Sequence, residues 1–268
     1  MFSSVYIVFR HNFDHTKQNH IKNFVTNAGF KILPSVNDDV SLIISIGGDG
    51  TFLRGVEVKG KKNIPVLGVN MGGHLGYLTA ETDLEKAIDR VRKGKYLVEE
   101  KSLVVARVNK NSENIFELQA LNEIVIRGEN NKPINMDITI SKSKLEGYFG
   151  DGIIISTPTG STAYNLSLGG PIVDAECNNL VITPISPIDL NFRPIVLDDK
   201  KCIKLDFKVS AGKRKYIFAD KQESPLKEGN YSILVEKAVN PLNIISFPEV
   251  KNDFIQILHK KILGHRKC

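Results

Sequence analysis

The sequence has no tryptophan and only three cysteines among its 268 residues. Cys177, Cys202 and Cys268 are far apart and odd in number, so they fit neither a disulfide framework nor a C-x-x-C metal pair. Free thiols persist in reducing compartments, and this cysteine usage predicts a cytoplasmic protein.

Long apolar runs are also missing. No segment approaches the roughly 18 apolar residues that a membrane-spanning helix needs. The first ten residues lack the basic region of a secretory signal, and we interpret them as a first strand. We therefore expect no membrane partner.

Basic residues outnumber acidic ones, with a formal net charge of +6, but they are spread along the chain apart from a short group at 260–267. Aromatic residues do not alternate with them, so we expect no nucleic-acid partner. The charge is better suited to an anionic small-molecule ligand.

Several familiar motifs are absent. The sequence contains no G-x-G-x-x-G, no H-E-x-x-H and no Cys/His pattern with metal-ligand spacing. Residues 55–62 nearly match a P-loop, but Lys62 stands where Ser or Thr should bind Mg²⁺. The motifs therefore identify no metal ligands, and the metal site is unknown from sequence.

Up to residue 97, short apolar runs alternate with helical patterns. The runs at 5–9 and 42–46 predict buried strands, and 14–28 has apolar residues at helical spacing. Thr82 to Glu85 has the spacing of a capping box, which predicts that Thr82 caps the next helix. This alternation predicts a Rossmann-like α/β domain over residues 1–97 with a largely parallel sheet.

From residue 98 to 247 the pattern changes to short strands separated by turn residues. Apolar and polar residues alternate strictly at 134–140 and 203–209. We predict a second, β-rich domain here, resembling a β-sandwich. Residues 250–263 again show a helical stripe, so we expect a C-terminal helix that returns to the first domain, which residues 248–268 complete.

A glycine-rich turn, Gly47-Gly48-Asp49-Gly50-Thr51, directly follows the apolar run 42–46. Glycines let the backbone approach phosphate oxygens, and successive N–H groups form an anion-binding nest. Asp49 would repel phosphate, so it suggests a proton acceptor, a metal partner or a hydroxyl anchor. Alternatively, the turn only connects a strand to a helix that Asp49 caps.

Two further stretches combine polar side chains with strand patterns. Residues 156–164 contain five hydroxyl residues and end in Tyr164, which suits ribose, phosphate and a base ring, although a plain polar loop is the alternative. Asn122 and Glu123 interrupt an apolar strand. Buried polar groups need partners, so these two either satisfy each other and the backbone or bind a ligand.

In this order and spacing, residues 47–51, Asn122-Glu123 and 150–152 with 156–164 resemble the signature of the bacterial-type NAD kinase family. The resemblance extends over nearly the whole chain, including residues 68–76 and Arg193-Pro194. It implies ATP-dependent phosphorylation of the 2′-hydroxyl of the adenosine ribose of NAD to give NADP. It also implies a divalent metal such as Mg²⁺, a homo-oligomer (dimer or tetramer) and an active site between the two domains.

The resemblance also implies roles for particular residues. Asp49 matches the proton acceptor, and the glycine turn supplies the phosphate-binding positions Gly47, Gly48, Gly50 and Thr51. The positions that match NAD-binding residues of the family are Asp49, Gly50, Arg54, Asn122, Glu123, Asp151, Thr162, Ala163, Tyr164, Asn165, Leu166, Ser167 and Gln222.

One position departs from the family pattern. Many members have a basic residue two positions before Asp151, where this chain has Phe149. A charge contact to the substrate is therefore missing or comes from elsewhere. Two other functions share part of the pattern: a diacylglycerol-type lipid kinase with the same Gly-Gly-Asp-Gly turn, and a catalytically inactive NAD-binding regulator.

Overall fold

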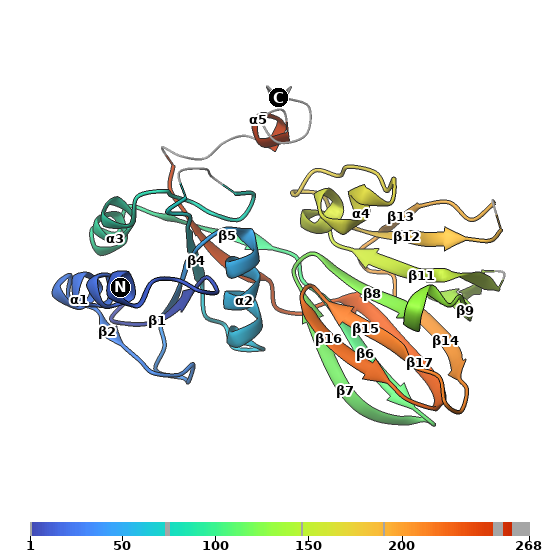
Figure 1. Cartoon of the computed structure of the whole chain (residues 1–268). Coiled ribbons are helices and arrows are strands. Elements are labelled where there is room, and N and C mark those ends of the chain that lie inside the picture. The colour runs from blue at the N-terminus through green and yellow to red at the C-terminus, as the bar shows by residue number, and fades with distance from the viewer. Residues whose placement is uncertain (1, 73–75, 146, 190, 249–253, 259–268) are drawn as a thin grey trace, which may run out of the picture. The chain divides into compact units, whose positions relative to one another are not determined.

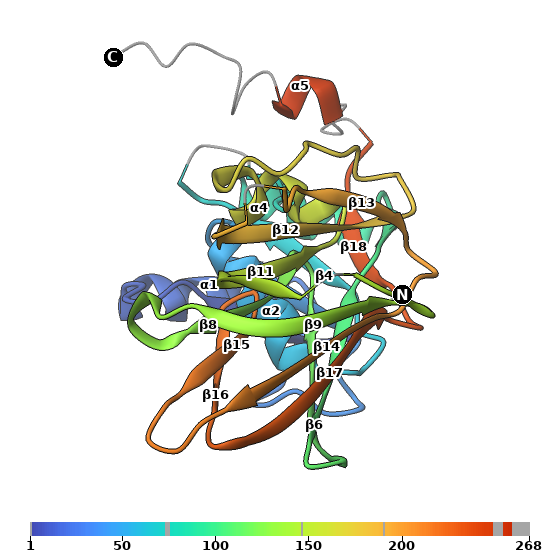
Figure 2. The same cartoon turned by 90° about the vertical axis from the view of Figure 1, so that its right-hand side faces the viewer.

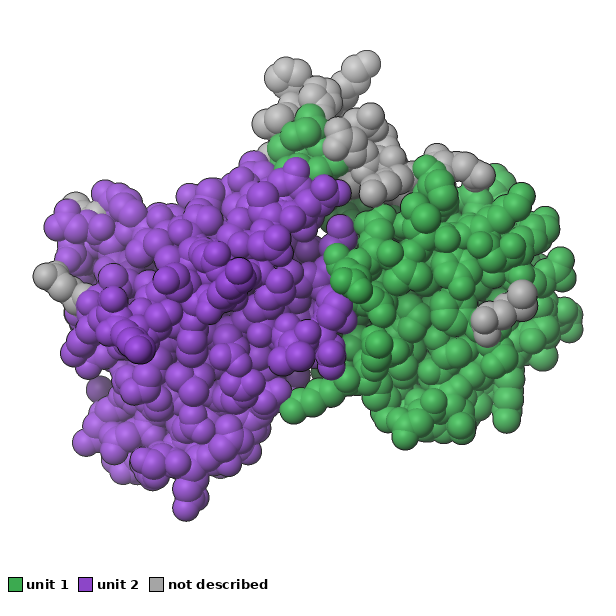
Figure 3. Space-filling view, turned by 180° about the vertical axis from the view of Figure 1, so that it is seen from behind, with its two compact units in different colours: residues 1–100, 242–268 green, residues 101–241 purple. Residues whose placement is uncertain are grey.

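The computed structural model describes residues 2–72, 76–145, 147–189, 191–248 and 254–258. The chain divides into two compact units (Figure 3). Unit 1 comprises residues 1–100 and 242–268, and unit 2 comprises residues 101–241.

Unit 1 is built on a six-stranded sheet with the strand order β2-β1-β3-β4-β18-β5 (Figure 1). Its first four strands and β18 pair in parallel. Strands β3 and β4 are buried at every residue, as expected for parallel strands covered on both faces. The strand bounds are β1 (Ser4–Phe9), β2 (Lys31–Ile32), β3 (Leu42–Ile46), β4 (Val66–Val69), β5 (Leu97–Lys101) and β18 (Leu242–Ser246).

Among the described residues, three helices pack on this sheet: α1 (His15–Asn27), α2 (Asp49–Lys59) and α3 (Leu84–Arg92). Helices α1 and α3 share one core with the strands, to which they contribute Ile21, Val25 and Ile88 among others. Helix α2 lies on the other face of the sheet (Figure 1). The predicted α/β organisation with helices on both faces is confirmed.

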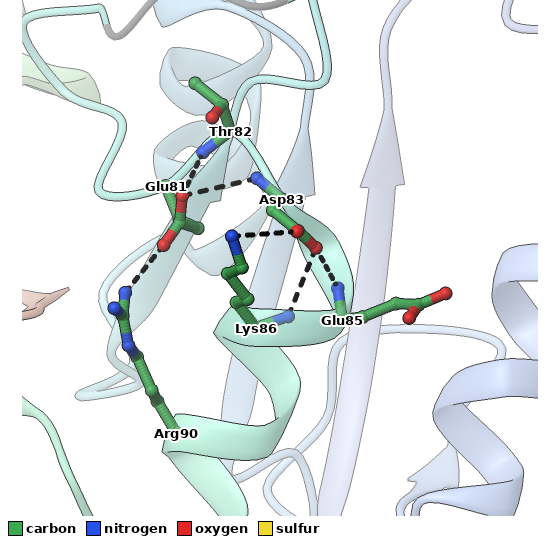
Figure 4. A network of polar contacts seen from close by, with 6 residues as sticks. All are labelled: Glu81, Thr82, Asp83, Glu85, Lys86 and Arg90. Carbon is green, nitrogen blue, oxygen red and sulfur yellow. Dashed lines mark hydrogen bonds and ion pairs between the residues drawn. The ribbon is translucent and has the colours of Figure 1, made fainter.

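The start of α3 differs from the predicted capping box. The cap is Asp83, whose carboxylate accepts a hydrogen bond from the Glu85 N–H at 3.0 Å (Figure 4). Glu81 accepts the N–H of Thr82 at 2.8 Å and pairs with Arg90 at 2.6 Å. Because Glu81 orients the preceding turn, the helix begins one residue later than the Ser/Thr-x-x-Glu spacing suggests.

The end of the chain also differs from the predicted division. Residues 242–247 were predicted to belong to the β-rich domain, but β18 pairs with β4 of unit 1, where Ile244 lies opposite Val66. A short apolar run indicates a strand without indicating its partner, so this pairing was not visible in sequence. Helix α5 spans Phe254–Leu258, within the predicted C-terminal helix. The rest of the predicted helix over 250–263 lies outside the described residues.

Unit 2 is a twelve-stranded antiparallel sheet (Figure 2). Its main strand order is β16-β15-β8-β11-β9-β14-β17-β6-β7, with β10 on β9, and with β12 on β11 and β13. The strands are β6 (Val104–Lys110), β7 (Glu113–Ala120), β8 (Glu123–Gly128), β9 (Ile134–Ile140), β10 (Ser143–Lys144), β11 (Tyr148–Ser156), β12 (Asn179–Pro187), β13 (Ile195–Asp198), β14 (Ile203–Val209), β15 (Lys215–Ala219), β16 (Gln222–Leu226) and β17 (Gly229–Lys237). Short helical turns are η1 (Glu129–Asn131), η2 (Thr159–Thr162) and α4 (Tyr164–Ser167).

The core of unit 2 explains why alternation was visible in the sequence. Ile134, Met136 and Ile138 on β9 all point into one apolar cluster that also takes residues from β6, β11, β14 and β17. The β-rich prediction is therefore confirmed, but the described strands form one connected sheet instead of the two sheets of a sandwich. Alternation identifies the buried face of each strand and leaves open whether the sheet curls on itself or faces a second one.

Candidate active site

The glycine turn of unit 1 connects the end of β3 to the start of α2. Gly47 has φ +151°, and a Cβ on it would lie 2.3 Å from Thr51 Oγ1, so a larger residue does not fit. Gly48 occupies the cap position of α2 and provides no side-chain cap. The first N–H groups of a helix have no intrahelical acceptor, and such uncapped groups bind anions.

The predicted phosphate-binding residues of this turn differ in whether their backbone N–H groups already have a hydrogen-bond acceptor. The Gly47 N–H donates to Val69 O at 2.9 Å, and the Thr51 N–H donates to Gly48 O at 2.8 Å. In the described part of the chain, no protein acceptor takes the N–H groups of Gly48, Asp49 and Gly50. These three groups are the ones available to phosphate oxygens.

Asp49 is the first residue of α2 and is half-buried. Its Oδ2 accepts the Tyr77 N–H and its Oδ1 accepts the Leu78 N–H, both at 3.0 Å. A carboxylate has about four lone-pair positions, so roughly two remain for other groups. A Cβ on Gly76 would lie 1.9 Å from Asp49 Oδ1, so this position must be glycine for the carboxylate to keep its place.

The segment that holds Asp49 is itself fixed against β4. The Ala80 N–H donates to Gly68 O at 2.9 Å, and the Asn70 N–H donates to Glu81 O at 2.8 Å. Sequence reasoning did not assign a role to Tyr77 and Leu78, because backbone donors leave no signature in side-chain identity. Burial and the nearby charge of Asp49 raise the pKa of the Tyr77 phenol.

Arg54 lies one turn along α2 from Gly50. Its Nη1 donates to the carbonyl of Phe9 at 3.2 Å, which places the guanidinium at the carboxyl end of β1. The structure thus brings Arg54 to the same end of the sheet as the glycine turn.

In unit 2, Asn122 and Glu123 stand at the start of β8, where Asp220 holds the backbone. The Asp220 carboxylate accepts the N–H groups of Leu121, Asn122 and Glu123 at 2.8, 2.8 and 3.2 Å. Asp220 has φ +52°, a conformation that aspartate tolerates better than most residues. Sequence reasoning missed this role, although an aspartate directly after a strand is a typical turn signal.

Glu123 is buried, with 7% of its surface exposed. Within the described residues its Oε2 has no hydrogen-bond partner. Burial, and secondly the charge of Asp220, raise the pKa of Glu123 to about 8. The Glu123 carboxyl is therefore mostly protonated at neutral pH and has an O–H group to donate.

The hydroxyl-rich run is folded directly against Asn122. The Thr157 N–H donates to Asn122 O at 2.8 Å, and Thr157 Oγ1 donates to Leu121 O at 2.6 Å. A Cβ on Gly160 would lie 2.1 Å from Asn122 O, so only glycine permits this approach. Two of the three predicted stretches are thus neighbours in unit 2.

The predicted NAD-binding residues between 162 and 167 differ in how far they are buried, and one of them supports the loop. Asn165 is fully buried: its Nδ2 donates to Ser161 O and Pro171 O, and its Oδ1 accepts from Thr183 Oγ1 at 2.6 Å. It was predicted as an NAD contact, but here its amide supports the loop. Of the other predicted positions, Ser167 is exposed, and the half-buried ones are Thr162, Ala163, Tyr164 and Leu166.

Tyr164 packs beside the small apolar cluster of Val125, Ile154 and Ile185. Val125 and Ile154 lie opposite each other on β8 and β11, and two residues away Glu123 lies opposite Ser156. Directly paired residues share a face, so Glu123 is on the Tyr164 side of the sheet.

Three remaining positions lie farther along the strands. Asp151 is half-buried where β11 leaves β9 and joins β8, five residues from Ser156, a span of about 17 Å in a strand. Gln222 is exposed at the start of β16, two residues after Asp220. Phe149, at the position where a basic residue was expected, is 44% exposed.

Neither a metal cage nor a membrane span is seen in the described chain. Among the described residues, no three His, Cys, Asp or Glu side chains gather closely enough to hold an ion. No described helix is both long and apolar enough to cross a membrane.

An uncapped glycine turn with a carboxylate in unit 1, and a hydroxyl-rich loop with an aromatic ring in unit 2, are features suited to a nucleotide-dependent phosphotransferase. Residues 4–96 match the ATP-NAD kinase N-terminal domain, and residues 121–247 match the ATP-NAD kinase C-terminal domain. The NAD kinase of Flavobacterium psychrophilum is 39% identical over 228 residues, covering 83% of this chain and 75% of the relative. That of Christiangramia forsetii is 35% identical, covering 87% and 79%. The chain belongs to the ATP-NAD kinase family.

Solved structures show the same fold. A yeast NADH kinase complexed with NADH superposes with a TM-score of 0.84 at 24% identity, covering all of this chain and 89% of the other. An NAD kinase from Archaeoglobus fulgidus in complex with ATP gives a TM-score of 0.72 at 23% identity, with 97% of each chain covered.

The family assignment fixes the reaction. Members phosphorylate NAD to NADP with ATP, and this is the activity of the present chain. The alternatives of a lipid kinase and of an inactive regulator are therefore not retained.

Proposed function

We propose that Asp49 accepts the proton of the adenosine 2′-hydroxyl of NAD while that oxygen attacks the γ-phosphorus of ATP. One observation carries this assignment: the carboxylate is held by two backbone N–H groups directly beside the open N–H groups of Gly48, Asp49 and Gly50. A base and an anion site therefore adjoin within one turn of backbone. Proton removal by a placed base contributes typically 10²–10⁴-fold to rate.

The step balances as a direct transfer. A bond forms between the ribose oxygen and the γ-phosphorus, the bond from that phosphorus to the β,γ-bridging oxygen breaks, and ADP leaves. The hydroxyl proton passes to Asp49. Because phosphoryl transfer depends mainly on placement and charge stabilisation, the open N–H groups contribute by holding phosphoryl oxygens. Tyr77 and Leu78 keep the carboxylate in one orientation.

Unit 2 supplies groups suited to NAD. The protonated carboxyl of Glu123 both donates and accepts, which matches a ribose hydroxyl. The half-buried ring of Tyr164 lies on the same side of the sheet and offers a flat face for a base. Asp220 acts indirectly, by fixing the backbone that carries Asn122 and Glu123.

The divalent metal implied by the family fits this arrangement as a companion of ATP. Mg²⁺ is commonly bound through substrate phosphates, water and one or two carboxylates. Asp49 belongs to the same turn as the open N–H groups and retains lone pairs for such a contact. When bound, the ion neutralises phosphate charge. Homo-oligomer formation and a cytoplasmic location stay predictions.

The direct test is an assay of the purified protein with ATP, Mg²⁺ and NAD, in which an NADP-specific dehydrogenase detects the product. We expect NADP from NAD and no phosphorylated product from an NAD analogue that lacks the adenosine 2′-hydroxyl. Phosphorylation of the deoxy analogue at the wild-type rate would show that another hydroxyl is the acceptor.

A further inference from the structure

A groove with a basic lining opens beside the glycine turn, entirely within unit 1. It encloses about 370 Å³ between the carboxyl end of β1, the first turn of α1 and one side of α2. Its charged and aromatic lining residues are Tyr6, Phe9, Arg10, His11, Phe13, His15 and Arg54, and no acidic side chain lines it. We call it the β1–α1 groove. Its volume is at the lower end of the range for small-molecule sites and exceeds the size of one phosphate.

The groove lies next to the glycine turn through Arg10. The Arg10 N–H donates to Ile46 O at 3.0 Å, and Arg10 Cβ lies 3.0 Å from the position of a Cβ on Gly47. From β1 the chain runs through α1 to β2 on one side, whereas from the neighbouring β3 it runs through α2 to β4 on the other side, so the direction reverses between β1 and β3. Ligands of open α/β sheets bind at the carboxyl ends of strands where the order reverses in this way.

The two arginines of the groove are held in different ways. The Arg10 guanidinium carbon lies 5.8 Å from the centre of the Phe13 ring, and that ring lies 5.3 Å from the Phe9 ring. Arg54 is fixed by its bond to Phe9 O. Cation–π contacts restrict an arginine without using its N–H donors, which stay available for a bidentate contact to phosphate.

We propose that the β1–α1 groove binds the phosphate chain of the phosphoryl donor, with Arg10 as a donor-specific contact. The inference rests on the proposed function, since it names where the remaining phosphates lie while the terminal one occupies the glycine turn. Two sources share this chemistry, a nucleoside triphosphate and inorganic polyphosphate. The family resemblance places Arg54 among the NAD contacts, whereas its position here is a wall of the donor groove.

The test compares Arg10→Ala with Lys17→Ala, which removes one exposed positive charge from α1 outside the groove lining. For R10A we expect the KM for ATP to rise about tenfold, the loss that accompanies one charge-assisted hydrogen bond, with the KM for NAD and the melting temperature unchanged. K17A should match the wild type in both constants. A rise in the KM for NAD alone, or no change in either, would overturn the proposal.

A binding measurement without NAD separates this proposal from the activity. Calorimetry of the whole chain with ATP, and separately with inorganic tripolyphosphate, should give a weaker Kd for R10A than for wild type and K17A. Loss for both probes identifies a phosphate-chain site, and loss for ATP alone restricts it to nucleotides. Equal affinity of R10A and wild type for both probes would exclude the groove, whether or not NADP is formed.

Discussion

Asp49 in unit 1 and Glu123 in unit 2 are both carboxyl groups at the start of a helix or strand, but they differ in burial and in the groups that surround them. Asp49 is half-buried, and backbone N–H groups bond both of its oxygens. Glu123 is buried next to Asp220, whose carboxylate accepts the neighbouring backbone N–H groups. Burial and the charge of Asp220 raise the pKa of Glu123 to about 8. Burial and a neighbouring charge thus leave Glu123 with a proton to donate in a hydrogen bond, whereas two backbone N–H groups hold the Asp49 carboxylate in place.

The largest expected effect comes from removing the base. Asp49→Asn should lower kcat by about 10²-fold to 10⁴-fold, because the amide does not take the hydroxyl proton. The amide nitrogen also meets the N–H of Tyr77 or Leu78, so we expect a loss of about 1 kcal/mol in the free energy of unfolding. Steady-state kinetics and urea unfolding measure both, and NAD affinity should be largely kept.

The matched control is Asp83→Asn, at the other helix start where a carboxylate accepts two N–H groups. Both bonds go to the same oxygen, Oδ1, so asparagine preserves them. D83N should keep the wild-type kcat. A D49N enzyme with wild-type turnover would remove Asp49 from its assigned role.

The second effect tests the orientation of the same carboxylate. Gly76→Ala places a methyl group 1.9 Å from Asp49 Oδ1, so the carboxylate must move. A displacement of about 1 Å at a reacting group can cost about 10²-fold in rate, and we expect a loss of that order in kcat. In the control Gly72→Ala, the nearest atom to the methyl group among the described residues is Asn70 Oδ1, at 3.2 Å. Similar kinetics for both variants would contradict the steric explanation.

A smaller effect is expected in unit 2. Tyr164→Ala should weaken NAD binding by about 1–3 kcal/mol, or roughly 5-fold to 150-fold in Kd, if the ring stacks on a base. Tyr164→Phe keeps the ring and should bind normally. Leu168→Ala removes a neighbour from the same apolar cluster and controls for lost packing. An unchanged Kd for Y164A excludes stacking.

The smallest effect concerns the proton on Glu123. The pKa of Glu123 is about 8 in the folded chain, whereas the usual pKa of a glutamate is 4.5. The folded chain therefore keeps this proton to a higher pH. Between these values the folded state binds more protons than the unfolded state, so the free energy of unfolding falls as pH rises, by about 1.4 kcal/mol per pH unit for one proton. This contribution is fully present below about pH 4.5 and is lost through about pH 8.

Glu123→Gln has no proton to lose, so its unfolding free energy should depend less steeply on pH between 5.5 and 8. Urea titrations at several pH values measure the slope. Glu85→Gln, an exposed glutamate on α3, should keep the wild-type slope. Identical slopes for E123Q and wild type would show that Glu123 is already ionised in the folded chain.

Much of this organisation could be predicted because it depends on local sequence. The strand at 42–46 and the glycine turn after it could be predicted because an apolar run and three glycines follow one another directly. The core face of α3 and the alternation in β9 follow from periods of 3.6 and 2 residues. The roles of Asp220 and Gly76 were not predicted, because their partners Glu123 and Asp49 are distant in sequence.

By itself, the sequence determined the two kinds of secondary structure, the glycine turn with its carboxylate and the membership of a kinase family. Only the tertiary structure decided that β18 joins the first sheet, that Asn165 supports a loop, and that Glu123 carries a proton while Asp49 is bonded by two N–H groups. The physical reason is that burial and backbone hydrogen bonds depend on which distant segments meet, and side-chain identity does not encode a backbone donor.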